Sequence, residues 1–242
     1  MSGGGRFGAA LAGAATAFAP ILWERLPELV HQPRAQWWRD ATVAQRLIAD
    51  AAALAGADAM FLFAAAEAVR ETVESGHGGD DVIDALAAGE AAAAGAELAA
   101  CLRAAGGCAV IAALPDPVAL CRALHGEEAE AAEDAFTDLA LSYLQAGVDA
   151  LAVIGDGAEE IAAGVARGCR VAELFGTPVL GLRVGPAEAS GWVHDGPELG
   201  VLGDAGEWPG LGVRGVVVTP GDVSGRWDAQ RLRAAGNEGR ER

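Results

Sequence analysis

Lysine is absent from this chain, since all 17 basic residues are Arg. This absence excludes, within the chain, a Schiff-base aldolase and pyridoxal phosphate anchored on a lysine. Cysteine is scarce, and the few cysteines lack the CxxC or CxH spacing that places two ligands on one metal. No apolar secretory segment opens the sequence, so we expect a cytoplasmic, reduced protein without a metal site. The four cysteines are Cys101, Cys108, Cys121 and Cys169.

Positive charge is also scarce, with 17 basic residues against 34 acidic ones and a formal net charge of -17. Such a chain repels phosphate backbones and anionic lipid surfaces, so we expect neither a nucleic-acid nor a membrane partner. The longest Ala-rich run, residues 85–105, carries Glu90, Glu97 and Arg103. It is predicted to be a helix outside any bilayer, because a membrane span needs about 20 mainly apolar residues.

The short motifs that bind phosphates or metals are missing. The sequence contains no P-loop, no HExxH and no GxSxG pattern. The glycine runs Gly3–Gly5 and Gly78–Gly79 do not follow strands, so neither is predicted to cradle a phosphate. We therefore expect no cofactor.

A repeated helix, turn and apolar strand dominates what is present. It occurs in residues 42–63 and again in residues 133–157, where the strand stops at Gly155, Asp156 and Gly157. Runs that are apolar at both alternating positions indicate a parallel sheet covered by helices on both faces. A closed barrel and an open, doubly wound sheet both fit. The predicted strands are residues 17–23, 59–63, 108–114, 150–155, 178–184 and 214–219.

The pattern weakens after Val184. Residues 185–212 are rich in Gly and Pro and indicate at most one short strand, near residues 199–202, and no helix. A closing amphipathic helix is predicted over residues 226–236, with Leu232 as its apolar contact. With 52% hydrophobic residues, residues 15–236 can form one domain, between flexible ends at 1–14 and 237–242.

If the helices surround a barrel, functional side chains should lie where strands end. Arg25 could bind a ligand carboxylate through a bidentate ion pair, or could form a surface ion pair with Glu24 or Glu28. Asp156 could act as a general acid or base, or could cap the helix that begins near Glu159. The candidates for substrate binding at these positions are Trp23, Arg25, Glu67, Asp116 and Arg183.

Aromatic and imidazole side chains have simpler interpretations. Trp37 and Trp38, with Phe18 and Trp23, could wall a pocket, but packing of the first helix onto the barrel is the favoured interpretation. No two histidines are spaced to ligate one metal, so they are interpreted as surface residues. They are His31, His77, His125 and His194.

Five segments in order resemble the uroporphyrinogen decarboxylase superfamily, which includes corrinoid methyltransferases and cobalamin-independent methionine synthase domains. The resemblance implies a (βα)8 barrel, here compact, with one or two βα units reduced or missing in its C-terminal half. It also implies a small anionic ligand, carboxylated or aromatic, bound by Arg25, with Asp156 as the matching acid. The segments are APILWERLPEL (19–29), GADAMFLF (56–63), VIAALPDPVALCRALHG (110–126), LSYLQAGVDALAVIGDG (141–157) and TPVLGLRVG (177–185).

Departures from the family pattern limit what can be carried over. The family's aspartate falls at Ala64 or Ala65, its tyrosine at Ala123 and its histidine at Thr219. The zinc-binding His-x-Cys pattern of the methyltransferase branch is also missing. The resemblance therefore predicts a lyase, decarboxylase or transferase type of activity that is not uroporphyrinogen decarboxylation. A non-catalytic barrel that serves as a binding or assembly subunit is the alternative.

A homodimer is expected for two reasons. Dimers are usual in the family that the chain resembles, and a barrel without full helical cover exposes apolar surface that a second copy could bury.

Overall fold

The computed structural model describes residues 3–23, 26, 37–74, 90–123, 129–184, 189–196, 198–201, 215–219 and 229–241. The strands are β1 Thr16–Phe18, β2 Ala59–Leu62, β3 Ala109–Pro115, β4 Ala150–Gly155, β5 Val179–Val184, β6 Ala189–Val193, β7 Gly200–Val201 and β8 Gly215–Val218. The α-helices are α1 Gly3–Leu11, α3 Ala41–Ala55, α4 Ala64–Glu74, α6 Glu90–Ala105, α7 Pro117–Ala123, α8 Ala129–Gln145, α9 Ala158–Ala172 and α10 Ala229–Glu241. The 3-10 turns η2 Trp37–Arg39 and η3 Glu173–Phe175 complete the described elements.

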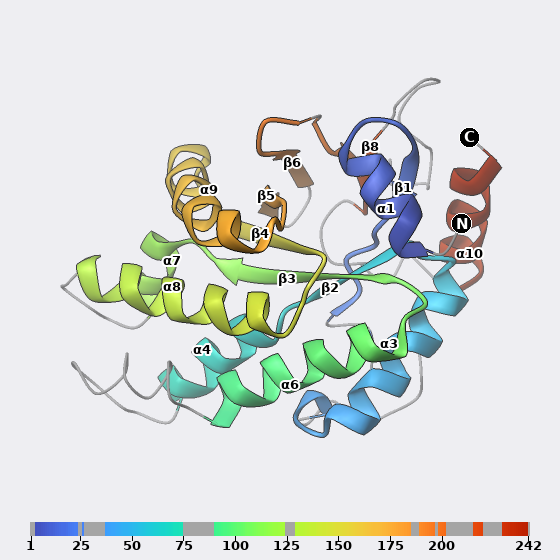
Figure 1. Ribbon diagram of the computed structural model, residues 1–242. Helices are drawn as coiled ribbons and strands as arrows, with labels where there is room; N and C mark the ends of the chain where they lie inside the picture. Colours follow the sequence, from blue (N-terminus) through green and yellow to red (C-terminus); the bar gives the residue numbers. More distant parts are fainter. Residues whose placement is uncertain are drawn as a thin grey trace.

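The strands form two sheets, in the orders β2-β3-β4-β5-β6 and β1-β8-β7 (Figure 1). Every paired neighbour is parallel except β6, which runs antiparallel to β5. The predicted α/β class and mostly parallel sheet are thus confirmed, and β2 to β5 follow one another in sequential order. Strand β1 pairs with β8, through Thr16 opposite Gly215.

The two faces of the strands pack into two separate apolar clusters. The outer cluster joins one face to the helices and contains Val153 and Val179. The inner cluster takes the alternate strand positions, including Ala152 and Leu180, together with Phe7 of α1. Figure 1 shows α3, α4, α6 and α8 on one side of β2 and β3, with α1 on the other. Burial at both alternating positions explains why the strands read as continuous apolar runs.

In two helix-to-strand turns, an aspartate makes the same pair of hydrogen bonds to an earlier strand. The N–H of Asp58 donates to the carbonyl oxygen of Phe18 at 2.8 Å, and its Oδ2 accepts from the N–H of Phe18 at 3.0 Å. Asp149 makes the corresponding pair of bonds to Val110, both at 2.9 Å. In each case the carboxylate fastens the start of one strand to a residue of an earlier strand.

Both ends that the sequence predicts to be flexible contain helical residues. Residues 3–11 form α1, because Phe7 and Ala10 bury an apolar face, at 1% and 0% exposure, against the inner cluster. Helix α10 continues to Glu241 and so includes residues 237–241. Leu232 is its fully buried contact, as predicted. Burial of Phe7, Ala10 and Leu232 is the physical reason that α1 and α10 pack against the rest of the protein.

Strand β6 is an element that the sequence did not indicate. Trp192 of β6 pairs with Gly181 of β5, and the indole carbons come within 2.6 Å of where a Cβ at Gly181 would stand. The missing side chain leaves room for the ring, which packs against the outer cluster. Strand β7 lies within the short strand predicted near residues 199–202, and residues 189–196 and 198–201 contain no helix.

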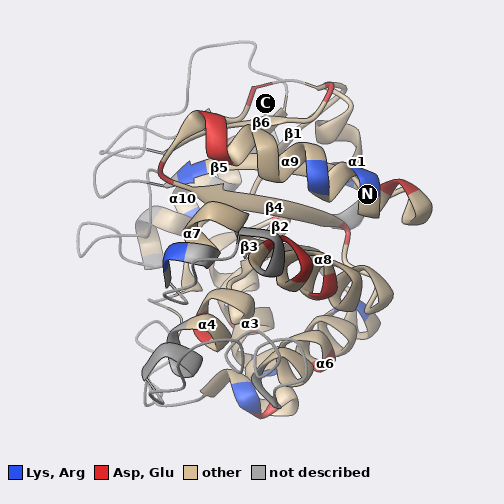
Figure 2. Ribbon diagram, turned by 90° about the vertical axis from the view of Figure 1, so that its left-hand side faces the viewer, with Lys and Arg blue, Asp and Glu red and all other residues tan. Residues whose placement is uncertain are grey.

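Charge is kept away from the strands that lie in the middle of the larger sheet. Strands β3 and β4 contain no charged residue, and the acidic and basic residues lie mainly on helices and loops, with Arg183 on β5 (Figure 2). Within the part of the chain that the structure describes, no helix is both long and apolar enough to cross a membrane.

Candidate functional site

The predicted site residues that the structure describes lie at the carboxyl ends of strands and fall into two groups. Trp23 and Glu67 follow β1 and β2, whereas Asp116, Asp156 and Arg183 belong to the ends of β3, β4 and β5. Arg25 lies outside the described residues.

The first group is an aromatic cluster with a carboxylate at its edge. Nε1 of Trp23 donates to Oε1 of Glu67 at 3.4 Å. The ring of Trp23 lies 4.8 Å from that of Trp37 and 6.4 Å from that of Phe63, measured between centroids. Glu67 is in the first turn of α4, and its N–H donates to the carbonyl oxygen of Phe63 at 3.1 Å. The structure thus brings together two site residues predicted from separate strand ends.

Exposure separates the members of this aromatic cluster by role. Trp23 is only 4% exposed, so its ring is packed within the protein. Trp37, Phe63 and Glu67 are partly exposed and can meet a ligand. Phe18 and Trp38 are buried in the outer cluster, at 1% and 2% exposure. Packing therefore accounts for Phe18, Trp23 and Trp38, and leaves Trp37 as the tryptophan of this cluster that solvent reaches.

Asp116 has a structural task in place of the substrate contact that the sequence analysis expected. Its side chain is 2% exposed, and Oδ1 accepts from the N–H groups of Val118 and Ala119, both at 2.9 Å. These bonds cap the start of α7. Its other oxygen, Oδ2, lies in the space that a Cβ at Gly155 would occupy. The N–H of Asp116 donates to the carbonyl oxygen of Ile154 at 2.8 Å, so Asp116 ties the end of β3 to the end of β4.

Asp156 and Arg183 are both exposed at neighbouring strand ends. Arg183 stands opposite Gly155 in the register of β4 and β5. It shares the alternation of Val179, which belongs to the outer cluster, so its side chain leaves the outer face of β5. The cap of α9 is Gly157, without a side-chain bond, so the alternative in which Asp156 caps this helix is wrong.

Three of the positions at which the resemblance would place polar family residues are buried: Ala64, Ala65 and Thr219. Ala64 and Ala65 are fully buried at the start of α4. Thr219 is also fully buried, and its Oγ1 accepts from the N–H of Ile21 at 2.9 Å, which links the end of β8 to the segment after β1. The side chain of Ala123 lies outside the described residues. No polar group of Ala64, Ala65 or Thr219 thus extends toward a ligand.

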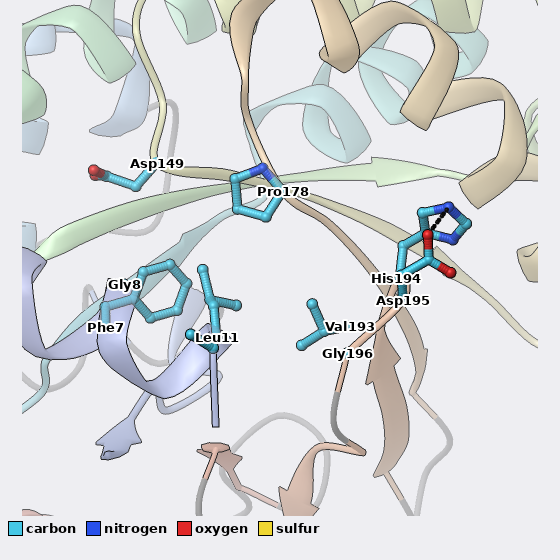
Figure 3. Close-up of a pocket in the computed structure, with 10 residues that line it drawn as sticks. Phe7, Gly8, Leu11, Asp149, Pro178, Val193, His194, Asp195 and Gly196 are labelled. Carbon is cyan, nitrogen blue, oxygen red and sulfur yellow. Dashed lines mark ion pairs between the residues drawn. The ribbon is translucent and has the colours of Figure 1, made fainter. Parts of the chain in front are cut away.

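The described residues also surround a hollow at the opposite, amino ends of the strands. It measures about 440 Å³, and Figure 3 shows Phe7 and Leu11 of α1 on one side and Val193, His194 and Asp195 on the other. Sequence reasoning missed this hollow because strand β6, which ends at Val193, gave no signal. Nε2 of His194 lies 3.5 Å from Oδ2 of Asp195.

Two of the described thiols, Cys108 and Cys169, lie near acidic side chains. Among the described residues, no three His, Cys, Asp or Glu side chains are placed to hold a metal ion. Burial, followed by the charges of Asp149 and Asp58, raises the pKa of Cys108 from 9.0 to about 11. Burial and the nearby Asp195 also raise the pKa of Cys169. Both thiols are therefore protonated at neutral pH and are weak nucleophiles.

Comparison with known proteins adds no relative to this picture. No protein-family model, curated protein or solved structure matches the chain.

Proposed function

We propose that this chain is a diverged and shortened barrel of the uroporphyrinogen decarboxylase type that binds a small aromatic carboxylate at the carboxyl ends of its strands. Closure of the two sheets into one barrel is the first part of the proposal. Asp58 bridges β2 to β1 through its two bonds to Phe18. On the other side, the N–H of Leu199 donates to the carbonyl oxygen of Gly191 at 2.9 Å, which links the segment before β7 to β6.

The inner cluster supports the same closure. One face of each strand contributes to it, or, for β7, the residue just before the strand. A side-chain core filled from all strands is what the interior of a closed barrel requires. The contributing residues include Ala17, Phe61, Ile111, Ala152, Leu180, Val193, Leu199 and Val216.

The hydrogen bond between Trp23 and Glu67, inside the aromatic cluster, is the observation that carries the binding proposal. The partly exposed rings of Trp37 and Phe63 offer apolar faces for the body of an aromatic ligand. The carboxylate of Glu67, which accepts the bond from Trp23, brings an acceptor group to the edge of these rings, where a ligand N–H or O–H would meet it. Trp23 itself is a positioning residue, because it is buried.

The anionic end of the ligand is assigned to arginine. Arg25, which matches a substrate arginine in the family resemblance, is the first cation in this assignment. Arg183 is exposed at the end of β5, beside the end of β4 that leads into Asp156, but its side chain leaves the outer face of β5, so it would meet only a ligand that extends over that edge. Asp156 is exposed, and we assign it the role of acid or base toward a ligand held between these groups.

Uroporphyrinogen is excluded as the substrate in this proposal. The positions of the family's aspartate and histidine are taken by the buried Ala64 or Ala65 and by Thr219, whose hydroxyl accepts a backbone bond. Each lost charge-assisted hydrogen bond removes about 1.5–3 kcal/mol of interaction. An assay that yields coproporphyrinogen with the purified protein would overturn this part.

Saturation-transfer NMR with benzoate and indole-3-acetate as probes tests the binding site. We expect transfer from the protein to both probes, and Glu67→Gln and Trp37→Leu should weaken binding by at least tenfold, which is about 1.4 kcal/mol. Phe175→Leu is the control, because Phe175 is also an exposed aromatic residue, at 42%, but lies in η3 at the opposite ends of the strands. Absence of transfer, or equal losses in the Trp37 and Phe175 variants, would contradict the proposed site.

A non-catalytic binding subunit is the second candidate, and Asp116 favours it. Because this carboxylate caps α7, one fewer acid at the strand ends is left for catalysis. The two candidates differ in what happens to a bound probe. Turnover that disappears in Asp156→Asn favours the enzyme, whereas a bound probe recovered unchanged favours the subunit.

A further inference from the structure

The aromatic cluster at the carboxyl ends of β1 and β2 has the composition of a site for an organic cation. Its rings are Trp23, Trp37 and Phe63, and the Glu67 carboxylate lies at their edge. The faces of aromatic rings carry partial negative charge, so they attract an ammonium group that comes within about 6 Å of a ring centroid. A carboxylate beside such rings strengthens the same preference. The ring faces and Glu67 thus favour a positive charge over a negative one.

The rings are close enough for one small ligand to contact two of them. The ring of Trp37 is inclined by 49° to that of Trp23, with 4.8 Å between the centroids. The ring of Phe63 is inclined by 43° to the same ring, with 6.4 Å between the centroids. Trp37 and Phe63 therefore both lie against Trp23, and both are partly exposed. A roughly spherical ammonium group has no plane to align, so inclined faces suit it as well as parallel ones.

The protein holds the Glu67 carboxylate beside these rings. Glu67 belongs to the first turn of α4, and its N–H donates to the carbonyl oxygen of Phe63 at 3.1 Å, so both side chains leave one short segment. Trp23, which is 4% exposed, donates to Oε1 of Glu67 at 3.4 Å. A carboxylate that is positioned before the ligand arrives loses less side-chain entropy on binding.

The charge of the whole chain acts in the same direction. A protein of net charge -17 attracts small cations and repels small anions. A ligand that is only anionic would approach Glu67 against this repulsion. An additional ammonium group on the ligand removes the conflict, because it can lie beside Glu67 while the ligand carboxylate extends away from it.

We propose that the ligand of this site is a zwitterion, an aromatic carboxylate that also carries an ammonium group, as aromatic amino acids do. The ammonium group lies beside Glu67 and against the exposed parts of Trp37 and Phe63. This inference rests on the proposed function, since it names the class of ligand at the same site. Trp37, Phe63 and Glu67 are ligand contacts in this arrangement, whereas the buried Trp23 positions Glu67.

Matched pairs of probes test whether the site prefers a positive charge. Phenylalanine and 3-phenylpropionate share a ring and a carboxylate, and only phenylalanine has an ammonium group. Choline and 3,3-dimethylbutan-1-ol share a shape, and only choline is charged. In competition saturation-transfer NMR, we expect the native protein to bind the ammonium member of each pair at least about tenfold more tightly. In Glu67→Gln this preference should fall to about threefold or less.

Two further variants separate a specific site from general attraction to an acidic protein. Trp37→Leu should weaken choline binding about fivefold, because it removes a ring face. Phe175→Leu removes an exposed aromatic residue of η3, so it should leave choline binding unchanged. Circular dichroism and urea denaturation check that the variants keep the native fold. Choline binding that is equal in the native protein and in Trp37→Leu would overturn the inference.

The outcomes also distinguish this inference from the proposed function. If 3-phenylpropionate binds at Trp37 and the ammonium group gives no advantage, the ligand is a simple carboxylate, so the inference fails while the proposed function stands. If none of the probes binds, both fail. A preference for both ammonium probes that Glu67→Gln removes supports the zwitterion.

Discussion

Replacing Tyr143 by Phe should stabilise this protein, although it removes a polar group. Tyr143 lies in α8, is 1% exposed, and its hydroxyl has no hydrogen-bond partner among the described residues. An unpaired buried hydroxyl costs about 1–3 kcal/mol. Phe keeps the ring and its packing, so Tyr143→Phe should raise the free energy of unfolding by about 1 kcal/mol or more. Urea denaturation at neutral pH measures this difference.

Alkaline pH gives the same residue a second signature. Burial raises the pKa of Tyr143 well above its usual 10.0. Above that usual value, the unfolded chain releases the tyrosine proton while the folded protein retains it, so the unfolded state binds fewer protons. Stability must then fall as the pH rises, by about 1.4 kcal/mol per pH unit. Tyr143→Phe should lack this part of the slope. Below the usual pKa neither state ionises, and no such slope is expected.

The single tyrosine of the sequence makes the assay clean, because any tyrosinate absorbance comes from Tyr143. In the native protein this absorbance should appear only together with unfolding. Gly95 supplies a further check, since a Cβ there would collide with the tyrosine hydroxyl and lie 3.0 Å from Cβ of Ala64. Gly95→Ala should therefore lower the free energy of unfolding by less in the Tyr143→Phe variant than in the native protein. A destabilised Tyr143→Phe, or tyrosinate in the folded state near the usual pKa, would refute the reasoning.

Three further outcomes follow from close contacts and burial. Burial raises the pKa of Cys108 from 9.0 to about 11. Iodoacetamide should therefore alkylate Cys108 about 100-fold more slowly in the folded protein than in urea. Equal rates would contradict its burial. Gly155→Ala should lower the free energy of unfolding by about 1–3 kcal/mol, because the new Cβ meets the Asp116 carboxylate. Gly181→Ala should displace the Trp192 ring and shift its fluorescence, whereas an unchanged spectrum would count against the observed packing.

The strands were predictable where burial alone decides them. Strand β4 spans Ala150–Gly155, the same residues that the apolar run indicated. The run is legible because outer and inner clusters bury its two faces, so no polar residue interrupts it. The turn before it was equally legible, because Gly147 adopts a φ of 82° that favours glycine.

Strand β6 was not predictable, because a tertiary contact creates it. Its residues Ala189–Val193 include a glycine and have no run of β-branched side chains. The strand forms because Trp192 finds the space left by Gly181. Neither residue signals the other in the sequence, and local propensity is readily overridden by such packing.

The candidate site was predictable in position and less so in role. Glu67 and Trp23 were identified by following strand ends, and they do meet. Asp116 was read as a substrate contact, although Pro117 after it is the usual first residue of a capped helix. That Asp-Pro pair was the available signal for its capping bonds to α7. Burial at 2% exposure decides the question, and burial of one polar side chain cannot be read from the sequence.

The two ends of the strands should respond differently to mutation, which Asp58 and Glu67 test together. Asp58 is 6% exposed at the amino end of β2, and its carboxylate holds the N–H of Phe18 at 3.0 Å. Asp58→Ala should lower the free energy of unfolding by about 2–3 kcal/mol, because it leaves a buried N–H without this acceptor. Asp58→Asn keeps an acceptor oxygen and should recover most of the loss. Glu67→Gln, at the carboxyl end, should leave urea denaturation nearly unchanged while it weakens probe binding. If the free energy of unfolding of Asp58→Ala lies within about 0.5 kcal/mol of that of the native protein, the Asp58 carboxylate does not stabilise the contact between β1 and β2. If Glu67→Gln lowers the free energy of unfolding but leaves probe binding unchanged, the aromatic cluster serves only for packing. That result would favour the hypothesis of a non-catalytic subunit.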